Sequence, residues 1–320
     1  MPELPEVLLS ALWLNDTLKG CEITNMKILT GRYSRHPLNG EELFRKYKPF
    51  KINEINSKGK FLWFDLTGKN DKSYYILNRF GLEGEWGFTK EKHSGLQFTI
   101  IDKDNIKSEL YFTDSRNFGT VEIVNNKNRL NTELNKLGPD FLKTPFTEQE
   151  FYNRIEDYVT KKTNKIIKAR GNQKIVTVLM NQTASGGLGS GLGNYLTAEI
   201  LYYAEISPHT TMKQLYEDKK TAFILADSIK YITKLAFLEA NVGYLAHLDP
   251  SMSTFIKKLR KNIDNNKNHE NNYHSDTILD EKDTFTFQVY GKKYDPFKNP
   301  VKPDKIIPGR TTYWVPAIQK

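Results

Sequence analysis

The chain begins Met-Pro-Glu-Leu-Pro-Glu, which places a proline beside the first residue and two carboxylates close behind it. If Met1 is removed, Pro2 becomes a terminal secondary amine whose pKa is far below that of a lysine side chain. Such an amine can attack an aldehyde carbon and form an iminium without a cofactor. Glu3 and Glu6 are near enough to donate or accept the protons. The sequence therefore predicts a nucleophilic centre here, although many proteins without catalytic activity also begin Met-Pro.

A second candidate site is the glycine-rich stretch 189–193, which is followed at once by Asn194 and an apolar run. Backbone N–H groups at the start of a helix can hold a phosphate. A third candidate, Lys60, lies in the basic turn 57–60, directly before a β-rich run. Taken alone, each residue has a simpler interpretation, Asn194 as a helix cap and Lys60 as a solvated surface lysine.

The spacing of apolar residues predicts the elements that would position these side chains. Between Val7 and Leu18 they recur at helical intervals, which predicts a helix over residues 5–19 that ends at a glycine. From residue 22 to about 124, short β-rich runs separated by Gly and Asn predict a β-sandwich. Residues 147–150, Thr-Glu-Gln-Glu, have the spacing of a capping box and predict the start of the next helix.

These signals favour an α+β fold that is interrupted by Leu-Gly-Pro-Asp at 137–140. Residues 256–283 are polar and charged, so we expect a mobile loop there, before a strand pattern returns at Phe285. We divide the chain into an N-terminal catalytic β-sandwich domain (1–137), a linker (138–144), a helical domain (145–250), a flexible polar loop (251–284) and a terminal hairpin (285–320).

The composition favours a polyanionic partner. The formal net charge is +9 and the pI is about 9.2, which suits nucleic acid, although a lysine-rich genome would have the same effect. Cys21 is the only cysteine, so the chain can form neither an internal disulfide nor a cysteine-rich zinc site. We find no signal peptide and no apolar run long enough to span a bilayer, and we expect an intracellular, DNA-associated protein with no membrane partner.

The opening residues resemble the N-terminus of the formamidopyrimidine-DNA glycosylase/endonuclease VIII (Fpg/Nei) family of DNA repair enzymes. Residues 189–199, in the context of Asn-Gln at 181–182 and Ser-Pro at 207–208, resemble the helix–two-turn–helix element of the same family. The resemblance implies that Pro2 is the nucleophile and that Glu3 assists it by proton transfer. Glu6 would support Glu3 or orient the terminus.

The same resemblance assigns phosphate contacts to four side chains. Lys60, which we group with the catalytic residues as well, would bind a phosphate flanking the damaged nucleotide from a hairpin near the active site. Arg79 falls where the family places a phosphate-contacting His or Arg. Asn194 would be a backbone-phosphate ligand, and Arg310 would grip phosphates beside the lesion.

An enzyme that acts on a base in a duplex must flip the base out and fill the vacated stack. The family uses a Met, an Arg and a Phe for this purpose. Here Leu82 stands at the methionine position, and Arg116 and Phe118 match the other two. Without the glycine turns beside them, Leu82 and Phe118 would be interpreted as core residues of strands.

The terminal hairpin resembles the zinc-finger hairpin of the family, but the four ligand positions hold Phe297, Pro300, Val315 and Ile318. None of these side chains can bind zinc, so we expect no metal and no other cofactor. The pattern resembles the zincless finger of some eukaryotic and viral members. We expect the four residues to pack the hairpin that a metal would otherwise hold.

Together these features predict a monomeric, bifunctional DNA glycosylase and apurinic/apyrimidinic (AP) lyase of base excision repair that acts on damaged DNA, double- or single-stranded. Pro2 would form a Schiff base with the sugar, followed by β,δ-elimination. Oxidised pyrimidines and ring-opened purines are the expected lesions, because residues 250–284 lack the Gly-rich, Thr-Leu-Arg pattern of enzymes that act on 8-oxoguanine. Two alternatives stay open: a non-catalytic protein that binds damaged or abasic DNA on the same scaffold, and, more remotely, an RNA-binding protein.

Overall fold

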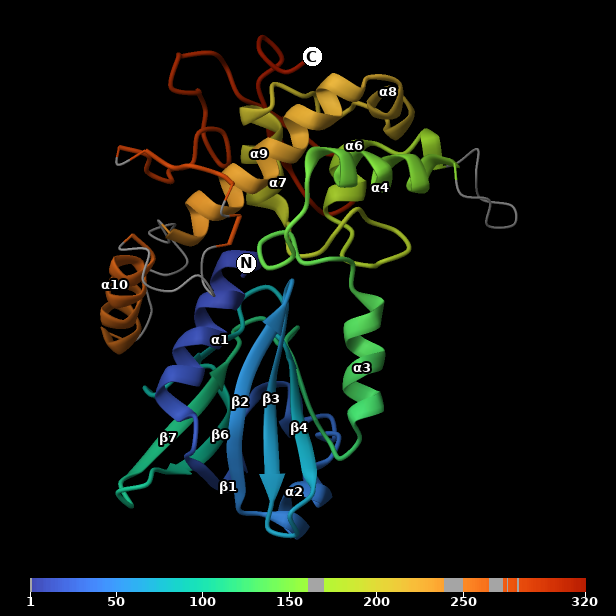
Figure 1. Cartoon of the computed structure of the whole chain (residues 1–320). Coiled ribbons are helices and arrows are strands. Elements are labelled where there is room, and N and C mark those ends of the chain that lie inside the picture. Colours follow the sequence, from blue (N-terminus) through green and yellow to red (C-terminus); the bar gives the residue numbers. More distant parts are fainter. Residues whose placement is uncertain (1, 161–169, 239–249, 265–272, 275, 281) are drawn as a thin grey trace. The chain divides into compact units, whose positions relative to one another are not determined.

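The computed structural model describes residues 2–160, 170–238, 250–264, 273–274, 276–280 and 282–320 (Figure 1). The chain forms two compact units. The first holds residues 2–135 and helix α10 (Pro250–Asp264), and the second holds the other described residues. Each unit has its own hydrophobic core and is described by itself.

Helix α1 (Leu4–Leu18) opens the first unit and confirms the predicted helix to within one residue at each end. It is buried along most of its length, and it ends where Gly20 adopts a φ of 89°, which favours glycine. Two hydrogen bonds fasten it along strand β2 (Phe50–Lys58): Ile55 N–H donates to the Asn15 side chain at 2.9 Å, and Gly20 N–H donates to the Ile52 carbonyl at 2.8 Å.

The rest of the first unit is built on one antiparallel sheet with the strand order β5-β7-β6-β1-β2-β3-β4-β8. Besides β2, its strands are β1 (Glu22–Ile28), β3 (Phe61–Gly68), β4 (Ser73–Arg79), β5 (Glu85–Gly87), β6 (Ser94–Ile101), β7 (Lys107–Thr113) and β8 (Thr120–Val124). The short elements η1 (Gly31–Ser34) and α2 (Glu41–Tyr47) and the helix α3 (Lys127–Lys136) complete the segment.

The sheet folds back on itself, and Trp86 of β5 shows how. Its indole packs against Phe64 of β3, with ring centroids 5.4 Å apart, and its N–H donates to the Asn78 side chain of β4 at 3.1 Å. Strands at opposite ends of the hydrogen-bonded order therefore face each other across an aromatic core. This arrangement confirms the predicted sandwich.

Helix α10 corrects one prediction, because residues 251–264 were expected to belong to a flexible polar loop. Met252, Ile256 and Leu259 are spaced as one helical stripe and are all buried. The many lysine and asparagine residues around them concealed this helical pattern in the sequence. The remainder of the predicted loop lies partly outside the described residues.

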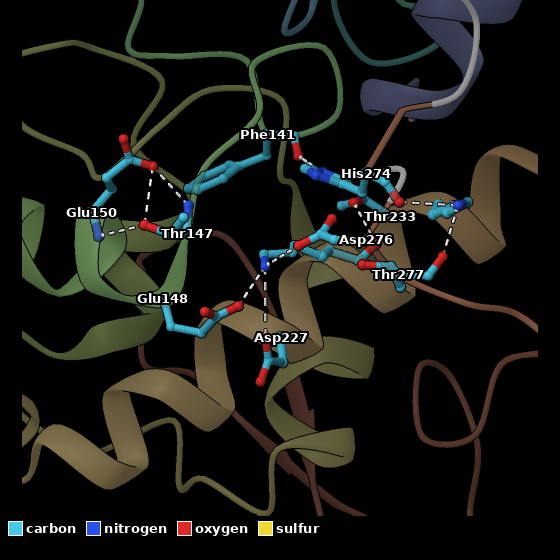
Figure 2. A network of polar contacts seen from close by, with 11 residues as sticks. Phe141, Thr147, Glu148, Glu150, Asp227, Thr233, His274, Asp276 and Thr277 are labelled. Carbon is cyan, nitrogen blue, oxygen red and sulfur yellow. Dashed lines mark hydrogen bonds and ion pairs between the residues drawn. The ribbon is translucent and has the colours of Figure 1, made fainter. Parts of the chain in front are cut away.

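The second unit is mainly helical. Its described helices are α4 (Glu148–Thr160), α6 (Ile175–Leu179), α7 (Asn194–Tyr203), α8 (Met212–Glu217) and α9 (Lys219–Leu238). Helices α4 and α7 pack against α9. The predicted capping box precedes α4: Thr147 N–H donates to the Glu150 carboxylate at 2.7 Å, and Glu150 N–H donates to the Thr147 hydroxyl at 3.2 Å (Figure 2).

Lys230 of α9 is the centre of a charged cluster in this unit. Its side chain is only 2% exposed, and its ammonium donates to Glu148 at 2.5 Å and to Asp276 at 2.7 Å. The hydrogen bond from Lys230 lowers the pKa of Glu148 to about 2. Because Asp276 lies in the segment that leads to the terminal hairpin, the cluster ties that segment to helices α4 and α9 (Figure 2).

One turn further along α9, a second buried lysine strengthens this attachment. Lys234 donates to the backbone carbonyls of His274 and Thr277 at 3.0 and 2.8 Å. The imidazole of His274 is itself buried and lies 2.6 Å from the carbonyl oxygen of Phe141 (Figure 2). The start of the terminal segment is thus held by two lysines of α9 and by the backbone carbonyl of Phe141.

The terminal hairpin pairs β9 (Lys302–Asp304) with β10 (Thr312–Trp314). The strand pattern was expected to begin at Phe285, but residues 285–301 form turns and a loop. A small core of valines packs it against Ala198 of α7. Two of the four non-ligand residues, Val315 and Ile318, belong to this core. The expectation was wrong for the other two, because Phe297 is 78% exposed and Pro300 is also exposed. Val289 and Val301 take their place in the core.

Among the described helices, none combines the length and the apolar character needed to cross a membrane.

Candidate functional site

The predicted catalytic residues lie together at the start of α1. Pro2 is buried, and the carboxyl-bearing side chains of Glu3 and Glu6 are 1% and 2% exposed. Glu3 occupies the N-cap position of the helix, and its backbone N–H donates to the Glu6 carboxylate at 2.9 Å. The positive end of the helix dipole favours a carboxylate in this first turn. Glu6 therefore fixes the backbone from which the Glu3 side chain and Pro2 project.

Lys60 lies in the two-residue turn between β2 and β3, after Gly59 with a φ of 56°. A glycine in this conformation at the first turn position is typical of a tight β-hairpin. The Asn15–Ile55 hydrogen bond shows which parts of α1 and β2 lie side by side. At the usual rises per residue, the helix from Asn15 back to Leu4 and the strand from Ile55 to Lys60 each span about 16 Å. Lys60 is therefore level with the start of α1.

The three predicted wedge residues lie on two neighbouring loops of the first unit. Leu82 is half-buried in a tight turn after Gly81, whose φ is 69°. A Cβ on Gly81 would come within 2.5 Å of the Gly119 nitrogen, so only glycine allows this approach. The guanidinium of Arg116 lies over the ring of Phe118, 6.0 Å from its centre, and Phe118 is 58% exposed. The fold thus places the Leu82 turn beside the loop that carries Arg116 and Phe118, although the two loops are far apart in sequence.

Asp114 shapes the second of these loops. Its buried carboxylate accepts hydrogen bonds from Arg116 N–H at 3.1 Å and from Gly119 N–H at 2.6 Å. Glu83, from the first loop, forms an ion pair with Arg116 at 3.8 Å and accepts a hydrogen bond from Ser115. The exposed ring of Phe118 is therefore displayed on a backbone that is fixed from both sides.

Arg79 has a protein partner that the sequence did not reveal. Its guanidinium forms an ion pair with the carboxylate of Glu133, which is 3% exposed, and lies over the ring of Phe61. Arg129 pairs with the same carboxylate. Half of the Arg79 side chain is nevertheless exposed, so the pair orients the guanidinium at the end of β4 while leaving one side of it accessible.

In the second unit the structure joins Asn194 to the terminal hairpin. The Asn194 side chain donates to the Thr311 carbonyl at 2.9 Å, directly beside Arg310. Arg310 itself is exposed and follows a turn in which Gly309 has a φ of 73°. The first residue of α7 and the predicted phosphate-gripping arginine therefore belong to one rigid arrangement, at the N-terminus of a helix of ten residues.

Family models for the formamidopyrimidine-DNA glycosylase N-terminal and C-terminal domains match residues 1–121 and 275–320. The formamidopyrimidine-DNA glycosylase of Lactococcus lactis is 30% identical over 243 residues, which are 74% of this chain and 78% of the relative. The chain belongs to the formamidopyrimidine-DNA glycosylase family. As a member, it is a DNA-binding glycosylase of base excision repair.

Two solved structures have the same fold as this family member. A Lactococcus lactis Fpg mutant in complex with DNA that contains Fapy-dG gives a TM-score of 0.71, and the wild-type protein with DNA that contains an oxidised pyrimidine gives 0.69. In both comparisons the sequences are 22% identical and 100% of each chain is covered.

Glu199 is a residue of this family member that the sequence analysis missed. Its carboxylate is 2% exposed and accepts hydrogen bonds from three successive backbone N–H groups, those of Gln288, Val289 and Tyr290, at 2.8–3.1 Å. Burial raises the pKa of this carboxyl group, while the three donors oppose that shift. Since Glu199 and Asn194 lie on the same helix, α7 holds the base of the hairpin as well as the residue beside Arg310. An acid within the apolar run Ala-Glu-Ile was the available signal.

Over the residues that the structure describes, no group of three or more His, Cys, Asp or Glu side chains is arranged to hold a metal ion. Cys21 is buried as a free thiol in the first unit. In the terminal hairpin Val315 and Ile318, which stand at two of the four zinc-ligand positions of the family, belong to the apolar core. Hydrophobic packing and the Glu199 carboxylate hold the hairpin together.

Proposed function

We propose that this protein is a bifunctional glycosylase and AP lyase whose nucleophile is the amine of Pro2 after removal of Met1. The observation that carries the proposal is the arrangement at the start of α1, where Pro2 is followed by two almost fully buried carboxyl groups. The hydrogen bond from the Glu3 backbone N–H orients the Glu6 carboxylate and fixes the backbone that carries the Glu3 side chain. A preorganised acid–base pair beside an amine suits covalent catalysis on a sugar.

In the proposed reaction the lone pair of Pro2 attacks C1′, the glycosidic bond breaks as the base leaves with its electron pair, and the proton lost from the Pro2 nitrogen neutralises the departing base. Glu3 protonates the ring oxygen, so the sugar opens and a C1′ iminium forms. Loss of a C2′ proton expels the 3′ phosphate, and loss of a C4′ proton then expels the 5′ phosphate. Water finally hydrolyses the iminium and frees Pro2. Glu6 is a positioning residue, because it acts through the backbone of Glu3.

The DNA would be held by Lys60, Arg79, Asn194 and Arg310, and its stack would be filled by Leu82, Arg116 and Phe118. Exposure of Phe118 supports the wedge role, because a core residue would not be displayed on a loop in this way. Oxidised pyrimidines and ring-opened purines are the proposed lesions. DNA with each of these lesion types is bound by the structurally similar Lactococcus lactis protein.

Borohydride trapping tests the central step. The protein with Met1 removed is incubated with duplex DNA that contains an abasic site or thymine glycol, and borohydride is added to reduce any iminium. We expect a covalent protein–DNA adduct that is lost in Pro2→Gly and in protein that retains Met1. Tight binding to the same DNA without any adduct would overturn the proposal in favour of a non-catalytic damage-binding protein.

A further inference from the structure

The loop between Gly291 and Pro300 displays two large aromatic side chains that the fold does not use. Tyr294 is 61% exposed and Phe297 is 78% exposed. The hairpin core is completed without them, by valines from neighbouring positions. A single exposed apolar residue is common on protein surfaces, but two large rings exposed on one short loop can form a binding surface.

This loop is held in one conformation by hydrogen bonds around Asp295, which is 5% exposed. Its carboxylate accepts from the Asn299 backbone N–H at 2.7 Å, the Asn299 side chain at 3.0 Å and the Tyr202 hydroxyl at 3.1 Å. Val301 N–H donates to the Lys293 carbonyl at 3.0 Å and closes the loop. Tyr294 and Phe297 are therefore presented on a fixed backbone, so that their binding would carry a small entropic cost.

The exposed charged side chains of the loop are all positive. Lys292, Lys293 and Lys298 are exposed within the loop, whereas its one acid, Asp295, is directed inward to hydrogen-bond donors. Exposed rings among lysines are typical of surfaces that bind nucleic acid, in which bases stack on the rings and cations contact phosphates.

We propose that residues 292–298 form a second nucleic-acid contact, separate from the predicted phosphate contact of Arg310, that binds unpaired bases of single-stranded DNA by stacking on Tyr294 and Phe297. Strand β9 begins just after this loop, and β10 begins just after Arg310, so the two contacts lie at opposite ends of the antiparallel pair. The inference rests on the proposed function only in that its ligand is DNA. It predicts preference for a lesion near a strand end, gap or unwound segment.

The test compares two DNA ligands by fluorescence anisotropy. Both contain a stable abasic analogue in the same duplex, and one also carries a single-stranded overhang of about ten nucleotides. We expect the overhang to tighten binding by the wild-type protein. Phe297→Ala and Tyr294→Ala should each weaken binding of the overhang DNA by roughly 5-fold to 100-fold, the range set by the stacking of one base, and leave binding of the blunt duplex unchanged.

Ile106→Ala provides the matched control, because Ile106 is an exposed apolar residue of the first unit, 64% accessible, and should not affect either ligand. Lys298→Ala should reduce the slope of log K against log salt for the overhang DNA by about one, whereas Phe297→Ala should leave this slope unchanged. Equal binding of both ligands by the wild-type protein, or an undiminished overhang effect in Phe297→Ala, would overturn the proposal. Borohydride trapping is measured in parallel on the same blunt duplex with a true abasic site in place of the analogue, and it should be unaffected by Phe297→Ala, so failure of the Pro2 chemistry can be distinguished from failure of this contact.

Discussion

Glu3 and Glu6 are both buried at the start of α1, yet their surroundings give them different tasks. Glu6 accepts the backbone N–H of Glu3, so its oxygen is committed to the helix start. Glu3 occupies the position next to Pro2, where a carboxyl group can exchange a proton with the sugar. The two acids are therefore expected to respond differently to the same substitution.

Glu3→Gln should lower the rate of base excision by about 100-fold to 10,000-fold, the usual range for loss of a general acid. The same variant should keep covalent trapping on DNA that already has an abasic site, because the Pro2 amine remains. Single-turnover assays on DNA with a damaged base measure the rate of excision, and those on DNA with an abasic site measure covalent trapping. Glu6→Gln is the matched control, since its amide oxygen can still accept the Glu3 N–H, and its loss should stay below about 10-fold. Equal losses in the two variants would contradict the division of roles.

Arg310→Ala should weaken DNA binding at every sequence and reduce the slope of log K against log salt by about one. The side chain is exposed, so the thermal unfolding temperature should not change. Titrations between about 50 and 200 mM salt measure the slope. Lys19→Ala, an exposed lysine at the end of α1, is the control. Unchanged affinity and slope in Arg310→Ala would argue against its phosphate contact.

At the scale of elements, α7 and α9 organise the second unit by holding backbone that has no regular structure. Helix α7 uses Asn194 and Glu199 to hold the terminal hairpin at two places. Helix α9 uses Lys230 and Lys234 to hold His274, Asp276 and Thr277. Polar groups fasten these segments because each satisfies donors or acceptors that burial would otherwise leave unpaired.

Lys230→Met should destabilise the second unit by about 1–3 kcal/mol at neutral pH, less than for a fully buried pair because Glu148 is one-third exposed. In the folded protein the pKa of Glu148 is lowered to about 2 from an ordinary value of 4.5. The stability that the ionised Glu148 carboxylate gives to the folded protein is therefore fully present above pH 4.5, and it is lost as the pH falls towards 2. The difference in free energy of unfolding between wild type and variant should accordingly shrink over that interval.

Urea unfolding at neutral pH and at stepwise lower pH values gives this comparison. Lys213→Met is the control, because Lys213 forms an exposed pair with Glu217 and should change stability by less than about 0.5 kcal/mol. A Lys230→Met deficit that is independent of pH would show that the lysine acts through packing alone.

At the scale of the whole molecule, the positive net charge and the apolar packing of the hairpin lead to a prediction about metal. The purified protein should contain no stoichiometric zinc, and a chelator should change neither its melting temperature nor its trapping activity. Metal analysis and trapping with and without chelator measure this. Loss of activity on chelation, restored by zinc, would contradict the assignment of a hairpin that needs no metal.

The first helix, the sandwich, the capping box at Thr147 and the hairpin were all predictable, because each depends on neighbouring residues or on short periodic patterns. The placement of Leu82 and Phe118 at loop tips also followed from local glycine turns. Helix α10 was missed because three buried residues were outweighed by many polar ones.

The sequence by itself determined the chemistry that is available: an amine, acids and basic residues in a recognisable order. Only the tertiary structure decided which of these side chains are committed to partners. The pairing of Arg79 with Glu133, the Glu199 carboxylate beneath the hairpin and the exposure of Phe297 each depend on residues that are far apart along the chain. A local pattern fixes which groups a segment carries, whereas burial and pairing depend on the segments that pack against it.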